Sequence, residues 1–232
     1  MSNTSYREKL GIRWIIKPTL LFVFFIALTF ITAGRMDYWQ GWIFNGLNIS
    51  FMLASYIVLR DQKDLIKERQ KPGEGMKKWD KIYYLFSTLL FFIMFTTSVL
   101  DAGRFSWSPT VPFVVIILGC VFYSLGQLLV LWAKRSNRFF SSVVRIQADR
   151  DHIVCTNGPY RFVRHPGYLG GLICNVATPL LLGSYWGLIP AIPLMIPLIV
   201  RTYLEDRTLY AELAGYRDYV REVSFRLIPH IW

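Results

Sequence analysis

The sequence predicts an all-α, multi-pass membrane protein, and three observations support this fold class. Hydrophobic residues make up 53% of the 232 residues, and the mean hydropathy is positive at +0.35. These residues are gathered in long blocks rather than in the stripes of amphipathic helices, which is typical of membrane spans. Lys and Arg gather in alternate loops between the blocks. We therefore expect about six membrane-spanning helices, followed by a cytoplasmic C-terminal helix.

The spans are expected where an apolar block approaches the ~20 residues that a helix needs to cross a bilayer. The blocks that qualify or nearly qualify are 14–33, 41–59, 82–100, 111–133, 168–183 and 184–202. The first follows a basic segment, as a signal peptide would, but its length and the lack of a small-x-small cleavage site favour an uncleaved span. The last two blocks are short, and only 183–187 could form a turn between them. This predicts a tight helical hairpin over 168–202.

The loops between the spans differ in length and composition. Between the second and third spans, 60–81 mixes basic and acidic residues, and its first part, 61–70, could form a short surface helix. This loop is interpreted as a solvated connector, with a lid over a cytoplasmic site as the alternative. We divide the chain into a four-span membrane region, 1–133, and a C-terminal region, 134–232, which together form one integrated domain.

The formal net charge of +11 is explained by topology rather than by nucleic-acid binding. Of the 26 basic residues, 24 lie in the N-terminal stretch up to Lys17, in 60–81, in 133–165 or after residue 200. This alternation predicts that both termini and both long loops are cytoplasmic and face lipid headgroups. No nucleic-acid-binding motif accompanies the charge, so we expect no nucleic-acid partner. The oligomeric state is left open.

The cysteines and a small polar cluster indicate no further chemistry. Cys120, Cys155 and Cys174 predict no disulfide framework. Asp149, Asp151 and His152 lie close together, but without a fourth ligand they are interpreted as surface charges rather than as a metal site. Within the fourth span, Gln127 is expected to bond to another helix, because a polar side chain at that depth seeks a partner.

The chain turns from a basic segment into an apolar run at His165 and Pro166. Because proline is favoured at the first helical position, a helix is expected to begin here. The amides of Gly167, Tyr168 and Leu169 would then lack intrahelical acceptors and carry the positive end of the helix dipole. The sequence therefore predicts an anion-binding site at this helix start.

The stretch around this turn is identified with a known signature. Residues 158–170 resemble the Gly-Pro-Tyr-Arg-x-Val-Arg-His-Pro-x-Tyr-x-Gly motif of the superfamily of isoprenylcysteine carboxyl methyltransferases and phospholipid N-methyltransferases, which are integral-membrane enzymes. The resemblance continues at Arg201, where an acidic pair follows at 205 and 206. It covers roughly 125–229 and also includes Leu209, Gly215, Tyr216, Tyr219, Val220, Arg226, Leu227, Ile228 and Pro229.

The resemblance implies an S-adenosylmethionine-dependent methyltransferase acting on a lipidic or hydrophobic acceptor, with O-methylation of an isoprenylcysteine-like carboxylate favoured. Arg201 and Glu205 would be the catalytic positions, with Arg201 orienting the acceptor. Asp206 stands where the family more often has Glu. The membrane would be the inner membrane of a prokaryote or the endoplasmic reticulum of a eukaryote. Residues implied for the cofactor are Tyr160, His165, Gly167, Tyr168, Leu169, Gly170, Glu205 and Asp206.

These residue types suit the parts of that cofactor. Helix-start amides can bind its carboxylate. The acidic pair can bind its ammonium group or ribose hydroxyls, and the rings of Tyr160 and Tyr168 can face its adenine or sulfonium. A carboxylate acceptor needs only orientation by a cation such as Arg201, whereas an amine acceptor must first lose a proton.

Two alternatives remain open. Membrane reductases of the steroid-reductase type have a similar C-terminal region, but they usually carry Asn before the tyrosine and Glu after the glycine, where Gly167 and Gly171 stand here. A non-catalytic carrier would fit the prolines of the last span, although no matching pair of broken helices is visible in the two halves. The type of acceptor, whether oxygen, nitrogen or sulfur, is not specified by any motif.

Overall fold

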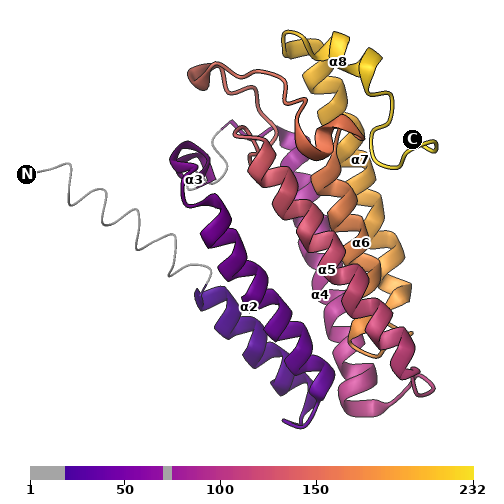
Figure 1. The fold of residues 1–232 in the computed structure, drawn as a ribbon. Helices are drawn as coiled ribbons and strands as arrows, with labels where there is room; N and C mark the ends of the chain where they lie inside the picture. The colour runs from indigo at the N-terminus through magenta and orange to yellow at the C-terminus, as the bar shows by residue number, and fades with distance from the viewer. Residues whose placement is uncertain (1–18, 70–74) are drawn as a thin grey trace, which may run out of the picture.

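The computed structural model describes residues 19–69 and 75–232, and in these ranges it contains helices and no strand. The described helices, in chain order, are Thr19–Ala33, α2 (Trp39–Leu59), α3 (Lys63–Arg69), α4 (Lys78–Val99), α5 (Phe113–Ser136), α6 (Pro166–Leu181), α7 (Leu188–Glu212) and α8 (Tyr216–Glu222) (Figure 1). The all-α prediction is confirmed. The start of the first expected span, 14–18, lies outside the described residues.

Four of the described helices are long and apolar enough to cross a membrane by length and composition, namely α2, α5, α7, and α4 with its continuation to Phe105. Thr19–Ala33 is apolar but shorter, and α6 has 16 residues. Within the described residues, each of the six apolar blocks therefore contains a helix. The short helix expected in 61–70 is also present, as α3.

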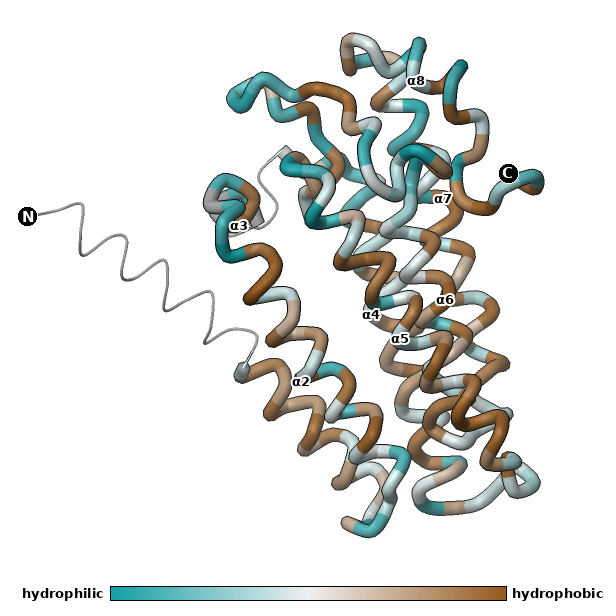
Figure 2. The backbone as a smooth tube through the Cα atoms, viewed as in Figure 1, coloured by the Kyte–Doolittle hydropathy of each residue, from teal (hydrophilic) through white to brown (hydrophobic). Residues whose placement is uncertain are grey.

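The long polar segments all lie at one end of the helix bundle. Figure 1 shows α3, the 137–165 segment, α8 and the C-terminus at this end, whereas the short turns lie at the other. Figure 2 shows apolar residues along the helices and polar residues gathered at the same end, which we call the loop end. This division agrees with the alternation of basic loops in the sequence.

The predicted hairpin is confirmed. α6 ends at Leu181, a turn follows in which Gly183 has φ +79°, and α7 begins at Leu188. However, α7 does not end near residue 202 as the apolar block suggested, but continues to Glu212. The acidic pair of the sequence motif, Glu205 and Asp206, therefore lies on the same helix as the apolar span, just beyond the end of the apolar residues.

α5 and α6 pack backbone against backbone through glycines. A Cβ added to Gly170 would lie 2.5 Å from the carbonyl oxygen of Gly126, and one added to Gly119 would lie 2.5 Å from the amide nitrogen of Leu181. Small residues allow such close approach of membrane helices. This contact sets the position of the α6 start relative to the segment that follows α5.

Gln127 is part of a chain of hydrogen bonds across helices. Its Nε2 donates to the Tyr123 hydroxyl at 3.0 Å, and that hydroxyl donates to Asn48 Oδ1 on α2 at 2.8 Å. The expected helix-to-helix bond is therefore made through Tyr123 rather than by Gln127 directly.

The α5–α6 contact makes a testable prediction about two glycines. Gly170→Ala should destabilise the protein by about 1 kcal/mol or more, because overpacking a close contact is costly. Gly46→Ala on α2 is the matched control, since its Cβ would meet nothing within 4 Å, and Ala is favoured over Gly within helices. Thermal unfolding of the purified protein in detergent measures both. Equal melting temperatures for the two variants would contradict the assigned contact.

Candidate functional site

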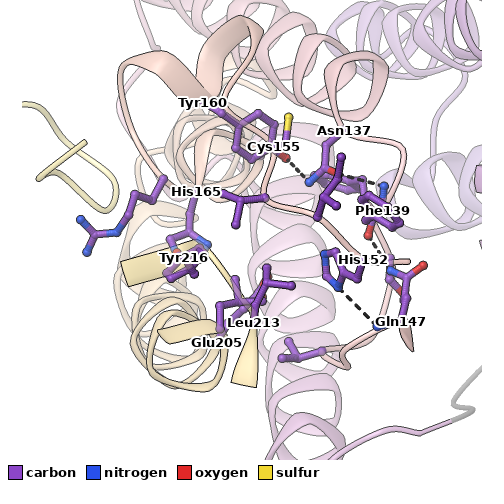
Figure 3. Close-up of a pocket in the computed structure, with 18 of the residues that line it drawn as sticks. Asn137, Phe139, Gln147, His152, Cys155, Tyr160, His165, Glu205, Leu213 and Tyr216 are labelled. Carbon is purple, nitrogen blue, oxygen red and sulfur yellow. Dashed lines mark hydrogen bonds between the residues drawn. The ribbon is translucent and has the colours of Figure 1, made fainter. Parts of the chain in front are cut away.

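A pocket lies at the loop end, between the segment 137–156 and the facing parts of α6, α7 and α8. Figure 3 shows Phe139, His152 and Gln147 on one side, with His165, Glu205, Leu213 and Tyr216 on the other. The pocket encloses about 90 Å³. Its lining also includes Asn137, Phe140, Val143, Val144, Arg145, Val154, Cys155, Tyr160, Gly167, Tyr168, Leu209 and Tyr219.

The start of α6 forms as the sequence predicts, with His165 as N-cap and Pro166 as the first helical residue. The expected anion site of several free amides is wrong, because the amides of Tyr168 and Leu169 donate to the His165 carbonyl at 3.1 and 3.2 Å. The first turn thus closes on the N-cap residue itself. Of the expected amides, only that of Gly167 is left without such a bond among the described backbone contacts.

Gly167 is needed for close packing at this point. A Cβ at Gly167 would lie 2.8 Å from the Phe140 ring. The ring therefore sits directly against the helix start and forms part of the pocket lining. A larger side chain here would displace the ring and change the pocket.

Tyr168 joins the helix start to α7. Its ring stacks on that of His165, with centroids 5.7 Å apart and planes 4° from parallel, and its hydroxyl donates to Glu205. On the other side, the Arg201 guanidinium carbon lies 5.4 Å from the Tyr168 ring centroid. The Glu205 carboxylate and the two rings thus meet in the pocket lining, with the Arg201 cation beside them.

Asp206 is the centre of a buried network. One oxygen, Oδ1, accepts from Arg164 Nε at 2.8 Å, Tyr216 hydroxyl at 2.8 Å and His165 Nε2 at 3.2 Å. The other, Oδ2, accepts from Arg164 Nη2 at 3.0 Å and Arg226 Nε at 2.8 Å. Burial and the Asp206 charge raise the pKa of Tyr216, so its hydroxyl stays a donor. The carboxylate does not line the pocket, so Asp206 is not in place to bind the cofactor as expected.

Arg201 lies next to the pocket rather than in its lining. Its Nε is 3.0 Å from Asp80 Oδ1, an ionic contact in which the N–H does not point at the oxygen, and its Nη2 donates to the Ser142 carbonyl at 2.7 Å. The guanidinium also faces the rings of Tyr83 and Tyr84, 4.3 and 5.1 Å from their centroids. None of these polar contacts uses Nη1.

An apolar groove reaches Arg201 from the other direction. It runs between α4 and α7, has a volume of about 420 Å³, and is lined by Trp79, Ile82, Tyr83, Phe86, Leu90, Pro193, Ile196, Pro197, Val200, Arg201 and Leu204. Arg201 is therefore placed between a polar pocket at the loop end and an apolar groove along the spans.

The structure brings together five of the expected site residues in the pocket lining, namely Tyr160, His165, Gly167, Tyr168 and Glu205. Leu169 and Gly170 lie elsewhere. Leu169 packs with Leu172, Leu198 and Leu227, and Gly170 packs on α5.

Sequence reasoning missed the wall formed by 137–155 and the partner of Arg201. Tyr216 and Leu209 carried a signal, since both belong to the matched motif region. Asp80 carried none, because it lies 121 residues from Arg201 in the chain.

His152 is half-buried in the pocket wall, not on the surface as expected. Its Nδ1 accepts from the Gln147 amide at 3.3 Å, and its ring lies 4.5 Å from that of Phe139. Burial, followed by the positive charges of Arg150 and Arg145, lowers the pKa of His152 to about 4. His152 is therefore neutral near pH 7. Among the described residues, no group of three or more metal-ligating side chains is found.

Comparisons with known proteins give a consistent family. The family model described as phospholipid methyltransferase matches residues 114–212. A protein-S-isoprenylcysteine O-methyltransferase of Schizosaccharomyces pombe is 38% identical over 65 residues, which is 28% of each chain. A probable protein-S-isoprenylcysteine O-methyltransferase of Oryza sativa subsp. indica is 32% identical over 120 residues, 49% of this chain and 57% of that protein. The chain thus matches less than two thirds of the length of either relative.

The fold also has a solved counterpart. The structure of the eukaryotic intramembrane Ras methyltransferase, an isoprenylcysteine carboxyl methyltransferase, superposes with a TM-score of 0.52 at 19% identity, covering 91% of this chain and 74% of that one. At this identity the likeness supports the helical membrane fold.

The environment of His152 predicts a pH effect on stability. Because its pKa falls from ~6.5 in the unfolded chain to about 4 in the folded one, the unfolded state binds the extra proton between these values. Stability should therefore decrease as pH falls through this window. His152→Gln should lose less stability than the wild type between about pH 6.5 and 4, measured by thermal unfolding. Parallel pH profiles would contradict the assigned pKa.

The Asp206 network predicts a large loss of stability on neutralisation. Asp206→Asn should cost about 3–5 kcal/mol, because the buried guanidinium of Arg164 and the half-buried guanidinium of Arg226 would be left without a counter-ion. Asp218→Asn is the matched control, since Asp218 pairs with Arg221 and both side chains are exposed, 75% and 81%; it should cost less than about 1 kcal/mol. Unfolding in denaturant compares them, and a similar cost for both would refute the network.

Proposed function

We propose that the chain is a member of the superfamily of membrane methyltransferases that contains the phospholipid and isoprenylcysteine methyltransferases, which its family-model match and its relatives support, and that it transfers a methyl group from S-adenosylmethionine to a lipidic acceptor. The observation that carries this proposal is the meeting of His165, Tyr168 and Glu205 in a pocket beside Arg201. The names of the relatives also favour methyl transfer over the reductase and carrier alternatives.

The residues of the pocket fit the parts of this cofactor. Glu205 can accept from its ammonium group or ribose hydroxyls, and the Gly167 amide can donate to its carboxylate. The rings of Tyr160 and Tyr168 can face its adenine or its sulfonium. When bound, the cofactor supplies an electrophilic methyl group, whose bond to sulfur breaks as the acceptor atom forms its own bond to the methyl carbon.

The pocket must widen to admit such a molecule. Its volume of about 90 Å³ is well below the ~300–1,000 Å³ of pockets that enclose drug-sized ligands. The 137–156 wall is mostly irregular backbone, whereas the facing residues lie on or next to helices. We therefore expect the wall to move outward when the cofactor binds.

The acceptor is proposed to lie in the apolar groove between α4 and α7. A hydrocarbon chain fits this lining, and the groove ends at Arg201. There the Nη1 group, which takes part in neither the Asp80 nor the Ser142 contact, can donate to an acceptor carboxylate. A carboxylate needs no general base, so orientation by Arg201 suffices. We therefore favour O-methylation of an isoprenylcysteine-like carboxylate.

The proposed topology places the loop end in the cytoplasm, as the distribution of Lys and Arg suggests. The water-soluble cofactor would then enter from the cytoplasm, and the acceptor would enter laterally from the bilayer. Residues of the chain do not move a proton in this scheme; they bind, orient and exclude water.

The role of Arg201 predicts a selective loss of turnover. Arg201→Ala should lower kcat/KM for an N-acetylated S-farnesylcysteine by about 100-fold or more, since alignment is the main contribution of the site. The affinity for S-adenosylhomocysteine should change far less than kcat/KM, because Arg201 contacts the pocket wall at Ser142 but does not line the pocket itself. Labelled methyl transfer and calorimetric titration in detergent measure the two quantities.

Arg207→Ala is the control, since Arg207 is an exposed arginine on the same helix. It should leave both quantities unchanged. Normal turnover in Arg201→Ala would contradict the proposed role. Transfer to phosphatidylethanolamine but not to the prenylated carboxylate would contradict the choice of acceptor.

A further inference from the structure

Asp80 is a buried acid that no sequence motif singles out. It lies in the first turn of α4 and its exposed fraction is 0%. Its Oδ2 accepts from the Val144 amide at 2.9 Å and from Arg201 Nη2 at 3.5 Å, while its Oδ1 lies 3.0 Å from Arg201 Nε. One carboxylate therefore connects α4, α7 and the 137–156 wall.

The stretch of wall that Asp80 holds is also held by Arg201. The Ser142 carbonyl accepts from Arg201 Nη2 at 2.7 Å and from the Tyr84 hydroxyl. The next two residues, Val143 and Val144, line the pocket. Arg201 is thus joined to this part of the wall directly through Ser142 and indirectly through Asp80, so a movement of one is expected to move the other.

The other side of Arg201 faces the apolar groove. Its guanidinium stacks on Tyr83, which also lines the groove. A long arginine side chain has many rotamers, and losing its ionic partner would leave several of them accessible. The position of the guanidinium at the groove end therefore depends on Asp80.

From these contacts we propose that Asp80 is a positioning residue for methyl transfer, which acts through Arg201. Its carboxylate fixes the guanidinium at the end of the acceptor groove and, by the same contact set, the 142–144 wall of the cofactor pocket. The inference rests on the proposed function, since it assigns the groove to the acceptor and the pocket to the methyl donor.

The arrangement also couples the two sites. If the wall moves when the cofactor binds, the Ser142 and Val144 contacts carry that movement to Arg201 and Asp80. Binding of S-adenosylhomocysteine should then change the affinity for the acceptor, and by thermodynamic linkage the acceptor should change the affinity for S-adenosylhomocysteine by the same factor.

Glu68 provides a matched comparison. It is also a buried acid, with 4% exposure, and pairs with an arginine of the same wall, because Arg145 donates to both of its oxygens at 2.9 and 2.8 Å. Glu68 is on α3 and makes no contact with Arg201 or the groove among the described interactions. If removing a buried acid acted only by lowering stability, the variants at Asp80 and Glu68 would show similar changes in kinetics.

The test compares Asp80→Asn with Glu68→Gln in the full-length protein in detergent, with N-acetyl-S-farnesylcysteine as acceptor. Asp80→Asn should raise the acceptor KM and lower kcat, each by about tenfold, and should abolish the coupling between acceptor and S-adenosylhomocysteine. Glu68→Gln should keep the acceptor KM and the coupling within about twofold. Adding Asp80→Asn to Arg201→Ala should cause no further kinetic loss, because the carboxylate acts through the arginine.

Wild-type binding and turnover are measured first, and their absence would contradict the proposed function itself. Given wild-type turnover, normal kinetics in Asp80→Asn would overturn the positioning role. Equal changes of acceptor KM in the two acid variants would also overturn it, as would additive losses in the double variant.

Discussion

The buried carboxylate of Asp206 is the interaction on which the geometry of the site depends. It draws together donors from three parts of the chain, namely Arg164 and His165 before α6, Tyr216 on α8, and Arg226 in the C-terminal segment. The C-terminal segment is also bonded to the helix start, because the amides of Arg164 and His165 donate to the carbonyls of Phe225 and Arg226 at 2.9 Å. The α6 start therefore has one orientation relative to α7, which places Tyr168 against Glu205.

The opposite side of the pocket is held differently. The 137–156 segment has little regular structure, with a short 3₁₀ turn at Ala148–Arg150. It is fastened at separate points by Asp80, Arg201 and Glu68. The helical side of the pocket, which the Asp206 network holds in place, thus faces a wall that is held by only a few contacts. This asymmetry suits a site that must open to admit a cofactor and close again around it.

Much of the fold could be predicted from the sequence, because the length of an apolar block and the position of prolines and glycines are local properties. The apolar blocks predicted the helices, the 183–187 stretch predicted the hairpin turn, and Pro166 predicted the start of α6. The continuation of α7 past residue 202 was missed, since a change to polar residues ends the span but not the helix.

The site could be predicted only in part. The motif identified His165, Tyr168 and Glu205, which the structure places in one pocket. It could not show that the amides of Tyr168 and Leu169 are used by the helix, or that Asp206 is occupied by protein donors, because these depend on three-dimensional partners. Asp80 and His152 have no local pattern, and their importance follows from contacts between distant segments.

The central claim is that the methyl donor binds between the 137–156 wall and the residues Tyr168 and Glu205. An experimental structure with S-adenosylhomocysteine tests it most directly: we expect the ligand in this pocket with the wall displaced outward, and a ligand bound elsewhere would contradict the account.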